Sequence, residues 1–356
     1  MKMLIMIVKV WGGNVMKKWD DFISEISSRF NSEWAKIYIK ALRKGERKHL
    51  KKLYTQFSNN RVETVAKIEK ICMCLDKQYQ NYYSSSFQFT RLPVLAHEVL
   101  SDPHALDKGN ELGRLFLHAL SIIRKEPFAK DSLKRAEHYM YSGIIMCDIS
   151  SYVTFSGLIE IRTDGEDINR VWEEACKRKE VLQIPLRNIM HLRSIRPYKG
   201  NRIYVVENPS VFSTILDKIA LEKPELPCPA IICSSGYNSL ALKELFRGIR
   251  ITNNNTRVEI WYSGDFDPEG LHIAQLLIDE LDDMVKLWKF SLSDYCKAGA
   301  FMKNIKLEKR EKLLDSLKNP DLREIGTKIK ETGNAIYQEA IVDELTSEII
   351  HYMELV

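Results

Sequence analysis

Three acidic side chains stand directly after two apolar segments in the carboxy-terminal half of the 356-residue chain. Glu207 follows Arg202–Val206. Asp265 and Asp267 follow Arg257–Tyr262. In extended backbone, residues two positions apart share a face, and neighbouring carboxylates repel each other unless protons or a cation intervene. Because a hard cation such as Mg²⁺ takes oxygen ligands, the pattern indicates a metal site. Glu207 would be a third ligand, a ligand of a second metal or a general acid–base.

Hydroxyl-bearing residues follow a third apolar segment that lies between these two. Ser234-Ser235-Gly236 comes after Pro229–Cys233. Placed ahead of a helix, these residues can offer backbone and hydroxyl donors to a phosphate. Acids, a metal and phosphate donors together fit phosphodiester chemistry.

Each of these features also has a plain structural interpretation. Asp267 precedes Pro268 and would serve as a helix N-cap, worth ~1 kcal/mol without any catalysis. The serines can be ordinary turn and cap residues. An isolated D-x-D also occurs in sugar transferases and phosphatases, although Glu269 stands where the aspartate-nucleophile phosphatases need Thr. The combination with Glu207 is what favours the metal site.

The elements expected to carry these residues alternate between strands and helices. The three apolar segments predict strands, and the stretches 210–221, 238–249 and 268–281 predict helices. Strands separated by helices imply right-handed crossovers and a parallel sheet, so the ends of the strands meet at one edge. With a helical tail over 284–356, this predicts a Rossmann-like βαβαβα domain.

The region ahead of this domain is predicted to be mainly helical. Helical spacing of apolar residues runs through 17–82, 91–124 and 131–146. The segment Ser151–Ile161 has β character, so a winged-helix element is one interpretation. The fold class is therefore α/β with a helical amino-terminal region, and the expected domains are 1–90, 91–198 and 199–356.

Basic residues are concentrated in two parts of the chain. Residues 1–52 carry a local net charge of +8, against +5 for the whole chain. This asymmetry suggests an anionic partner, with a solvated basic helix face as the alternative. The stretch 184–206 has no acidic residue and is interpreted as an exposed connector with four candidate DNA contacts, Arg187, Arg193, Arg196 and Lys199.

The composition excludes several classes of protein. Hydrophobic residues make up 45% and charged residues 28%, which is typical of a globular chain and excludes a disordered or collagenous one. The seven cysteines include no C-x-x-C pair, so a reduced, cytosolic chain is expected. Lys9 interrupts the apolar start, and no run approaches the ~20 apolar residues of a membrane helix. We therefore expect a cytoplasmic protein without a signal peptide or membrane contact.

A Glu after the first strand and a D-x-D after the third resemble the Toprim pattern of topoisomerases, primases and several nucleases. The longer strings VVENPSV (205–211) and SGDFDPEGLHIA (263–274) resemble the JetD-like proteins of Wadjet plasmid-defence systems. The resemblance extends through LAHEVLSDPHALDKGNELGRLFLHAL (95–120), SGIIMCDISSYVTFSGL (142–158) and AIYQEAIVDEL (335–345).

The resemblance implies a DNA-binding part followed by a Toprim domain that cuts circular DNA trapped by a condensin-like SMC complex. It implies metal binding and catalysis by Glu207, Asp265 and Asp267, with Glu269 as an extra ligand. The implied cofactor is Mg²⁺, with Mn²⁺ as the alternative, as one or two ions. The implied partners are double-stranded DNA and SMC subunits. Two cuts in a duplex favour a homodimer.

Two departures from the family pattern lie near the predicted site. Gly236-Tyr237-Asn238 replaces a Gly-Gln-Pro-like loop, and Pro268 replaces an aromatic residue, so the details of substrate binding are in question. The Asp102-Pro103-His104 turn also matches the family, and we interpret His104 as structural because no Cys or His is spaced to share a metal. Glu339 either approaches the acidic edge or faces solvent, and the second is favoured.

Three function classes remain open from the sequence. A Mg²⁺-dependent DNA endonuclease is the leading hypothesis. A topoisomerase-like strand-passing enzyme would need a tyrosine nucleophile, for which Tyr139, Tyr141 and Tyr152 are available without a motif that selects one. The third class is a non-catalytic subunit that binds DNA within an SMC complex.

Overall fold

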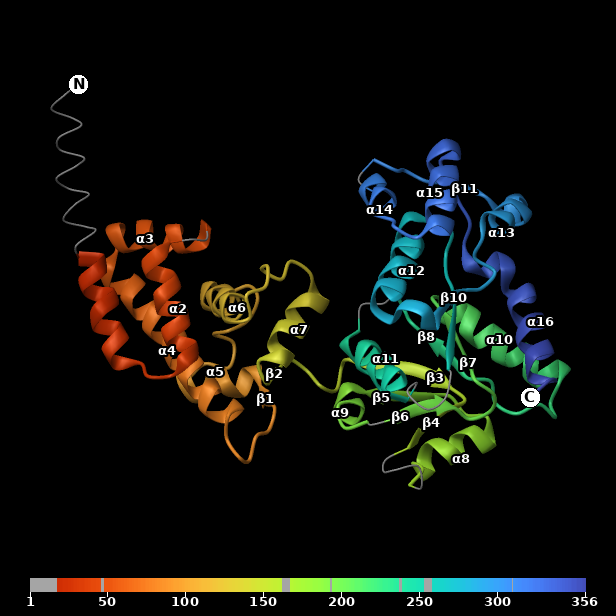
Figure 1. Ribbon diagram of the computed structural model, residues 1–356, viewed down its shortest axis with the longest axis horizontal. Helices are drawn as coiled ribbons and strands as arrows, with labels where there is room; N and C mark the ends of the chain where they lie inside the picture. Colours follow the sequence, from red (N-terminus) through yellow and green to blue (C-terminus); the bar gives the residue numbers. More distant parts are fainter. Residues whose placement is uncertain are drawn as a thin grey trace. The chain divides into compact units, whose positions relative to one another are not determined.

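The chain divides into two compact units, Met1–Cys147 and Asp148–Val356 (Figure 1). The computed structural model describes residues 18–45, 48–161, 167–192, 194–236, 239–252, 258–308 and 310–356. The three domains expected from the sequence, with limits at 90/91 and 198/199, stay a prediction. The compact division falls at 147/148, because the residues after Asp148 supply strands to the sheet of the second unit.

The first unit is a helical assembly, as the periodicity of the sequence predicts. The buried residues of α2 (Glu33–Lys44), such as Trp34 and Tyr38, lie on one face, and the helix ends at Gly45 with a left-handed φ of 61°. Residues 18–29 are also helical. The other helices are α2 (Glu33–Lys44), α3 (Lys48–Asn59), α4 (Arg61–Tyr82), α5 (Leu92–Leu100), α6 (Glu111–Ile123) and α7 (Ser132–Tyr141).

One short pair of strands interrupts this helical unit. β1 (Thr90–Arg91) pairs in parallel with β2 (Ile144–Ile145). The helix expected over 131–146 therefore ends early, at Tyr141. The reason is Gly143, whose φ of 72° is in the left-handed region that ends helices and favours glycine.

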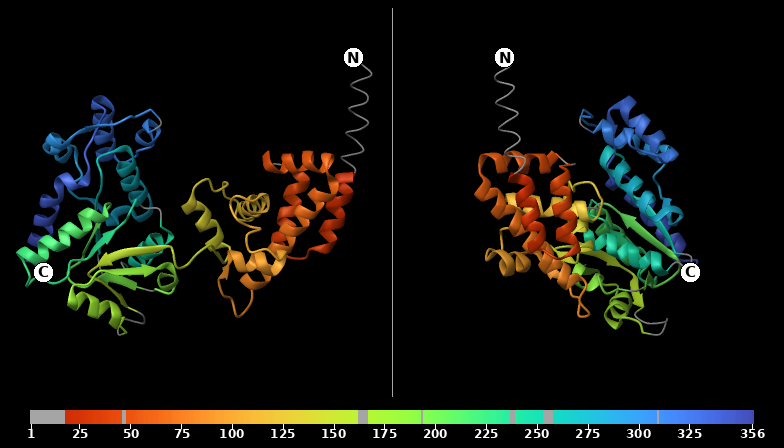
Figure 2. Two further views of the ribbon diagram at one scale, coloured as in Figure 1. Left: turned by 180° about the vertical axis from the view of Figure 1, so that it is seen from behind. Right: turned by 60° about the vertical axis from the view of Figure 1, so that its left-hand side comes forward.

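A six-stranded sheet forms the centre of the second unit, with its strands in the order β10-β9-β7-β8-β3-β5. Figures 1 and 2 show helices packed around the strands of this unit. The four strands from β10 to β8 are parallel, β3 runs antiparallel to β8, and β5 runs antiparallel to β3. The strands are β3 (Tyr152–Ser156), β5 (Leu182–Pro185), β7 (Arg202–Val206), β8 (Ile231–Cys233), β9 (Glu259–Ser263) and β10 (Val285–Leu287).

Three helices connect the parallel strands, in the order that the sequence predicts. They are α10 (Pro209–Glu222), α11 (Leu240–Thr252) and α12 (Pro268–Leu281). α10 packs against β7, β8 and the last helix of the chain, and α12 packs against β10 (Figure 1). This confirms the alternating strands and helices, and the ends of β7, β8 and β9 meet at one edge of the sheet.

The strands before β7 correct two sequence-based interpretations. β3 joins the central sheet, and β4 (Leu158–Ile161) pairs antiparallel with β6 (Ser194–Pro197), so these strands do not form a winged helix. The described parts of the stretch 184–206, which are residues 184–192 and 194–206, contain strands and a helix and are not an exposed connector. Ile195 and Pro197 point into the interior, and the basic Arg196 between them makes this period of two hard to see in the sequence. The remaining helices here are α8 (Arg170–Arg178) and α9 (Leu186–Ile189).

The tail after α12 is mostly helical, but it also contributes strands. β10 adds to the edge of the sheet beside β9, and β11 (Lys303–Asn304) pairs with β12 (Asn334–Ala335). The expected purely helical tail is therefore corrected. Its helices are η1 (Asp282–Met284), α13 (Leu292–Lys297), η2 (Ala298–Phe301), α14 (Glu311–Asp315), α15 (Pro320–Thr332), η3 (Gln338–Ile341) and α16 (Val342–Met353). Within the described ranges, none of the helices has the length and apolar character needed to cross a bilayer.

Candidate functional site

Glu207 and Asp265 lie next to each other, although 58 positions separate them in the chain. Glu207 follows β7 and Asp265 follows β9, and these two strands are parallel neighbours in the sheet. The backbone N–H of Asp265 donates to Glu207 Oε2 at 3.4 Å. The sheet therefore brings two of the predicted acids together at its carboxyl edge.

Two glycines permit this close packing. A Cβ on Gly264 would lie 2.4 Å from Tyr262 Oη and 2.9 Å from Glu207 Oε2. A Cβ on Gly270 would lie 2.1 Å from the carbonyl oxygen of Asp265. Both distances are far below van der Waals contact, so the glycines let the first turn of α12 and the end of β9 approach the acids.

Asp267 caps helix α12. Its Oδ1 accepts the backbone N–H of Gly270 at 2.7 Å, and Pro268 occupies the first helical position. The structural interpretation of this residue is therefore correct. Capping does not exclude a role of Asp267 as a metal ligand, because the charges of Glu207, Asp265 and Asp267 act on one another.

The acids are harder to ionise than in water. Burial, together with the charge of Asp265, raises the pKa of Glu207 to about 7. Burial and the charge of Asp267 raise the pKa of Asp265 to about 6, although two hydrogen bonds oppose the shift. Burial and the charge of Glu269 also raise the pKa of Asp267. Desolvation and like charge both disfavour the ionised form, so these groups share one environment.

Glu269 extends this carboxylate cluster, which consists of Glu207, Asp265, Asp267 and Glu269. Its Oε1 pairs with Arg310 Nε at 3.1 Å, and its Oε2 is buried without a hydrogen-bond partner among the described residues. The charge of Arg310 also acts on Asp267 and opposes the rise of its pKa. Arg310 is thus a cationic side chain that partly balances the cluster.

The chemistry of the donors fits a hard divalent cation. The cluster offers carboxylate oxygens, one of which, Glu269 Oε2, is buried and unpartnered. In the described parts of the chain, no three His, Cys, Asp or Glu side chains are already arranged so that they could hold a metal ion. Binding of a cation would therefore require the side chains of the cluster to move closer together.

Two neutral residues that the sequence analysis did not select hold the acids in place. Asn208 Nδ2 donates to Asp265 Oδ1 at 2.9 Å. The backbone N–H of Gln338 donates to the same oxygen at 2.8 Å, and the Gln338 side chain accepts the N–H of Glu207 at 3.1 Å. Asn208 lies within the VVENPSV string and Gln338 within the AIYQEAIVDEL string, so the resemblance could have pointed to both. Gln338 nevertheless follows no apolar segment, and nothing in its surrounding residues links it to the acids.

The serines after β8 are engaged inside the protein. The N–H of Ser234 donates to Val206 O, and the N–H of Ser235 donates to Glu207 O at 3.1 Å. The Ser234 hydroxyl is buried without a partner among the described residues. Neither amide is therefore free for a phosphate. Tyr237 and Asn238, which depart from the family pattern, lie outside the described residues.

The candidate DNA contacts have different surroundings. Arg187 on α9 pairs with Asp148 at 3.2 Å while its side chain stays 59% exposed. Arg196 lies half-buried on β6, and Lys199 is exposed. Arg193 lies outside the described residues. Among the described residues, no hydrogen bond or ion pair joins these side chains to the carboxylate cluster.

Other residues singled out from the sequence make local contacts. His104 Nδ1 contacts Asp107 Oδ2 at 3.0 Å within its own exposed turn. Glu339 is exposed and accepts the Ser210 hydroxyl at 2.7 Å, although its charge acts on Asp265. Of the candidate nucleophiles, Tyr139 is 1% exposed, so its hydroxyl is not accessible to DNA.

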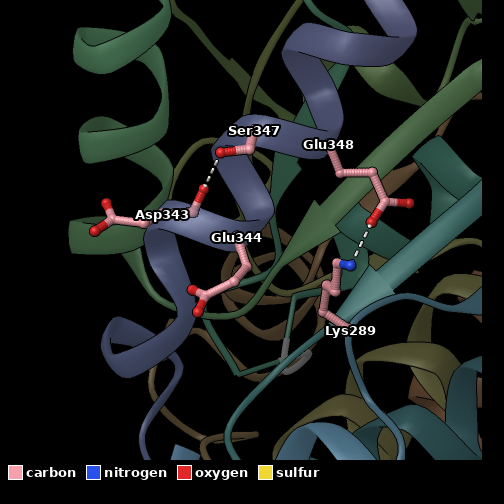
Figure 3. Close-up of a pocket in the computed structure, with 5 residues that line it drawn as sticks. All are labelled: Lys289, Asp343, Glu344, Ser347 and Glu348. Atoms are coloured by element: carbon pink, nitrogen blue, oxygen red, sulfur yellow. Dashed lines mark hydrogen bonds and ion pairs between the residues drawn. The ribbon is translucent and has the colours of Figure 1, made fainter. Parts of the chain in front are cut away.

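A second acidic surface lies on α16 and shares no residue with the carboxylate cluster. Its pocket is lined by Lys289, Asp343, Glu344, Ser347 and Glu348 (Figure 3). Lys289 pairs with Glu348 at 3.1 Å, and the Ser347 hydroxyl donates to the Asp343 carbonyl at 2.9 Å (Figure 3). Asp343 also pairs with Lys218 at 2.5 Å. The two ion pairs connect α16 to its neighbours, and the serine contact lies within the helix.

The fold and the site define a mixed α/β chain whose parallel strands end in a partly buried cluster of carboxylates. The chain matches two family models. Residues 16–160 match the model described as "Protein of unknown function N-terminus (DUF3323)". Residues 182–349 match the one described as "Protein of unknown function C-terminus (DUF2399)", which spans the whole cluster. No curated protein matches the chain. Both matches are consistent with a JetD-like protein.

Proposed function

We propose that this protein is a metal-dependent DNA endonuclease of the JetD-like kind, with a Toprim-type domain around the carboxylate cluster. The observation that carries the proposal is the meeting of Glu207 and Asp265 at the ends of neighbouring parallel strands. Partly buried acids with raised pKa values that cluster at strand ends are typical of functional sites in α/β folds. The resemblance of the surrounding sequence supplies the class of reaction.

In this proposal the cluster holds one or two Mg²⁺ or Mn²⁺ ions. Glu207, Asp265 and Asp267 would be the ligands, with Glu269 as an additional one. When bound, the cation would supply the positive charge that polarises a phosphodiester and stabilises the leaving oxygen. Glu207 has a second candidate role, which is to exchange a proton with the attacking water.

Basic side chains would hold the DNA by its backbone. Arg187, Arg193, Arg196 and Lys199 are the candidates, together with the basic amino-terminal helices. Contacts of this kind position DNA without reading its sequence, and they weaken as salt is added. We propose that the substrate is plasmid or other foreign double-stranded DNA, presented by a condensin-like SMC complex, and that a homodimer makes the two cuts.

The test is plasmid cleavage by the purified protein with Mg²⁺ or Mn²⁺. We expect nicked or linear DNA with the wild type, and a loss of at least about 100-fold in rate with Asp265→Asn plus Asp267→Asn. Asparagine also caps helices, so the change at position 267 should preserve α12. Asp131→Asn is the matched control, because Asp131 caps α7 in the same way and lies outside the cluster. Undiminished cutting by the double variant would overturn the proposal.

The same assay separates the two alternative functions. A topoisomerase-like enzyme would leave protein attached to a DNA end on a denaturing gel, and the accessible candidates are Tyr141 and Tyr152, each 48% exposed. A non-catalytic subunit would bind DNA whether or not a metal ion is present, and it would not cut DNA with any of the metal ions tested.

A further inference from the structure

Gln338 connects both acid-bearing strand ends to the tail of the chain. Its side-chain Oε1 accepts the N–H of Glu207 at 3.1 Å and the N–H of Asn208 at 3.3 Å. Its Nε2 donates to the carbonyl of Ser263 at 2.9 Å. Its own backbone N–H donates to Asp265 Oδ1 at 2.8 Å. One residue therefore contacts the end of β7, the end of β9 and a carboxylate oxygen of the cluster.

The geometry requires an amide side chain at this position. Backbone N–H groups can only donate and the Ser263 carbonyl can only accept, so the orientation of the Gln338 amide is fixed by its partners. A glutamate would lose the donor, and an apolar side chain would remove the hydrogen bonds that three partly or fully buried backbone groups make with the amide. Gln338 is itself fully buried, so these bonds are shielded from competition by water.

The segment around Gln338 is hydrogen-bonded to the short connection between β9 and α12, which carries the two aspartates. Phe266, between Asp265 and Asp267, exchanges two backbone hydrogen bonds with Ile336, at 2.8 and 3.2 Å. Phe266 and Ile336 are both fully buried. Residues 336–338 therefore act as a third side of the site, alongside the ends of β7 and β9.

We infer that Gln338 is a positioning residue of the carboxylate cluster and sets its affinity for a divalent cation by holding Glu207 and Asp265 at a fixed separation. This inference rests on the proposed metal site. Partners that orient metal-binding side chains typically change metal affinity by about 10- to 100-fold when they are removed.

The chain offers a close structural control. Gln275 on α12 is also buried, and its Oε1 accepts two successive backbone N–H groups, those of Lys318 and Asn319, at 2.7 and 2.8 Å. Its Nε2 donates to Asp279. It makes the same kind of connection between α12 and the tail, but it contacts no acid of the cluster. A glutamine that matters only for stability should behave like Gln275.

The experiment measures Mn²⁺ binding to the full chain by calorimetry and by electron paramagnetic resonance, for the wild type, Gln338→Met and Gln275→Met. Methionine keeps the volume of the side chain and removes its hydrogen bonds. We expect both variants to lower the unfolding midpoint, Gln338→Met to weaken Mn²⁺ binding at least about ten-fold, and Gln275→Met to change it less than about two-fold. Gln338→Ala, which leaves room for water to reach the backbone groups, is the second variant, and we expect it to weaken binding in the same direction.

Equal Mn²⁺ affinity in the wild type and in the folded Gln338 variants would overturn the inference while leaving the nuclease proposal intact. Equal weakening by the Gln275 and Gln338 variants would also overturn it, because the effect would then follow stability alone. A wild type that binds Mn²⁺ but cuts no DNA would overturn the nuclease proposal. The role of Gln338 would then be decided by the Mn²⁺ affinities of its variants alone. A wild type that binds no Mn²⁺ would overturn both.

Discussion

The ionised carboxylates of the cluster lower the stability of the metal-free protein, and Glu207 shows this most clearly. The unfolded chain ionises Glu207 near its ordinary pKa of 4.5, whereas the folded chain does so at about 7. Because the pKa of Glu207 is higher in the folded chain than in the unfolded chain, the protonated side chain contributes its full stabilisation below pH 4.5. This stabilisation is lost as the pH rises through 7. Ionised Glu207 therefore opposes folding at pH 8.

Replacing Glu207 by the isosteric glutamine should stabilise the metal-free protein at alkaline pH. In EDTA at pH 8 we expect Glu207→Gln to raise the unfolding midpoint by about 3 °C or more, and at pH 5 we expect a much smaller change. Differential scanning calorimetry at the two pH values measures this. Glu348→Gln, which removes the partner of Lys289, is the control and should not raise the midpoint at either pH. A Glu207→Gln midpoint at or below that of the wild type at pH 8 would contradict the account.

Residue types explain which parts of the site could be predicted. Glu207, Asp265 and Asp267 were found because acids after apolar segments are unusual and chemically specific. Gln338 was missed because a neutral amide in a tail has many uses, and its register against Phe266 is set only by the folded tail. Burial of the Ser234 hydroxyl could not be read from the sequence either, because serine occurs in turns, caps and interiors.

At the scale of elements, the position of α12 relative to β9 depends on Gly270. A methyl group there would overlap the Asp265 carbonyl, which is backbone and cannot rotate away. We expect Gly270→Ala to lower the unfolding midpoint by about 5 °C or more and to weaken Mn²⁺ binding, because the helix must move from the cluster. In Gly299→Ala the new Cβ would lie 3.6 Å from Met302 Cε, an ordinary contact, so this control should stay within about 1 °C of the wild type. Equal midpoints for both variants would show that α12 has room to shift.

The strands and helices were predictable where hydrophobic pattern and chain order agreed. β7 was predicted at its observed limits, and β8 and β9 within about two residues, because each is a short apolar run followed by a helix. β10 was missed because Val285–Leu287 is short and half-exposed at the edge of the sheet. The antiparallel strands β3 and β5 could not be assigned to this sheet, because the pairing of strands distant in sequence leaves no local signal.

At the scale of the whole molecule, each unit has its own buried core. Trp19, Phe22 and Leu75 belong to the core of the first unit. Phe155, Ile232 and Phe246 are buried within the second. The strands β3 and β5 lie before residue 199, yet they form one side of the central sheet. A division of the chain that ignores them would leave β8 with an unpaired edge.

Two fragments of the chain should therefore behave differently. We expect residues 148–356 to unfold cooperatively on heating and to bind Mn²⁺ with an affinity within about three-fold of the full chain, because the sheet and the cluster are complete. We expect residues 199–356 to lack cooperative unfolding. Without β3, the three register pairs from Thr154–Cys233 to Ser156–Ile231 are lost, and α11 loses the strands on which it packs.

Circular dichroism melts and calorimetry of the two fragments measure this difference directly. Their comparison also separates the sequence-based limit at 198/199 from the compact division at 147/148. Cooperative unfolding and Mn²⁺ binding by residues 199–356 would mean that the parallel strands and the tail suffice to hold the acids. In that case β3 and β5 would be accessory to the site, and the limit inferred from the change in hydrophobic pattern would be the true one.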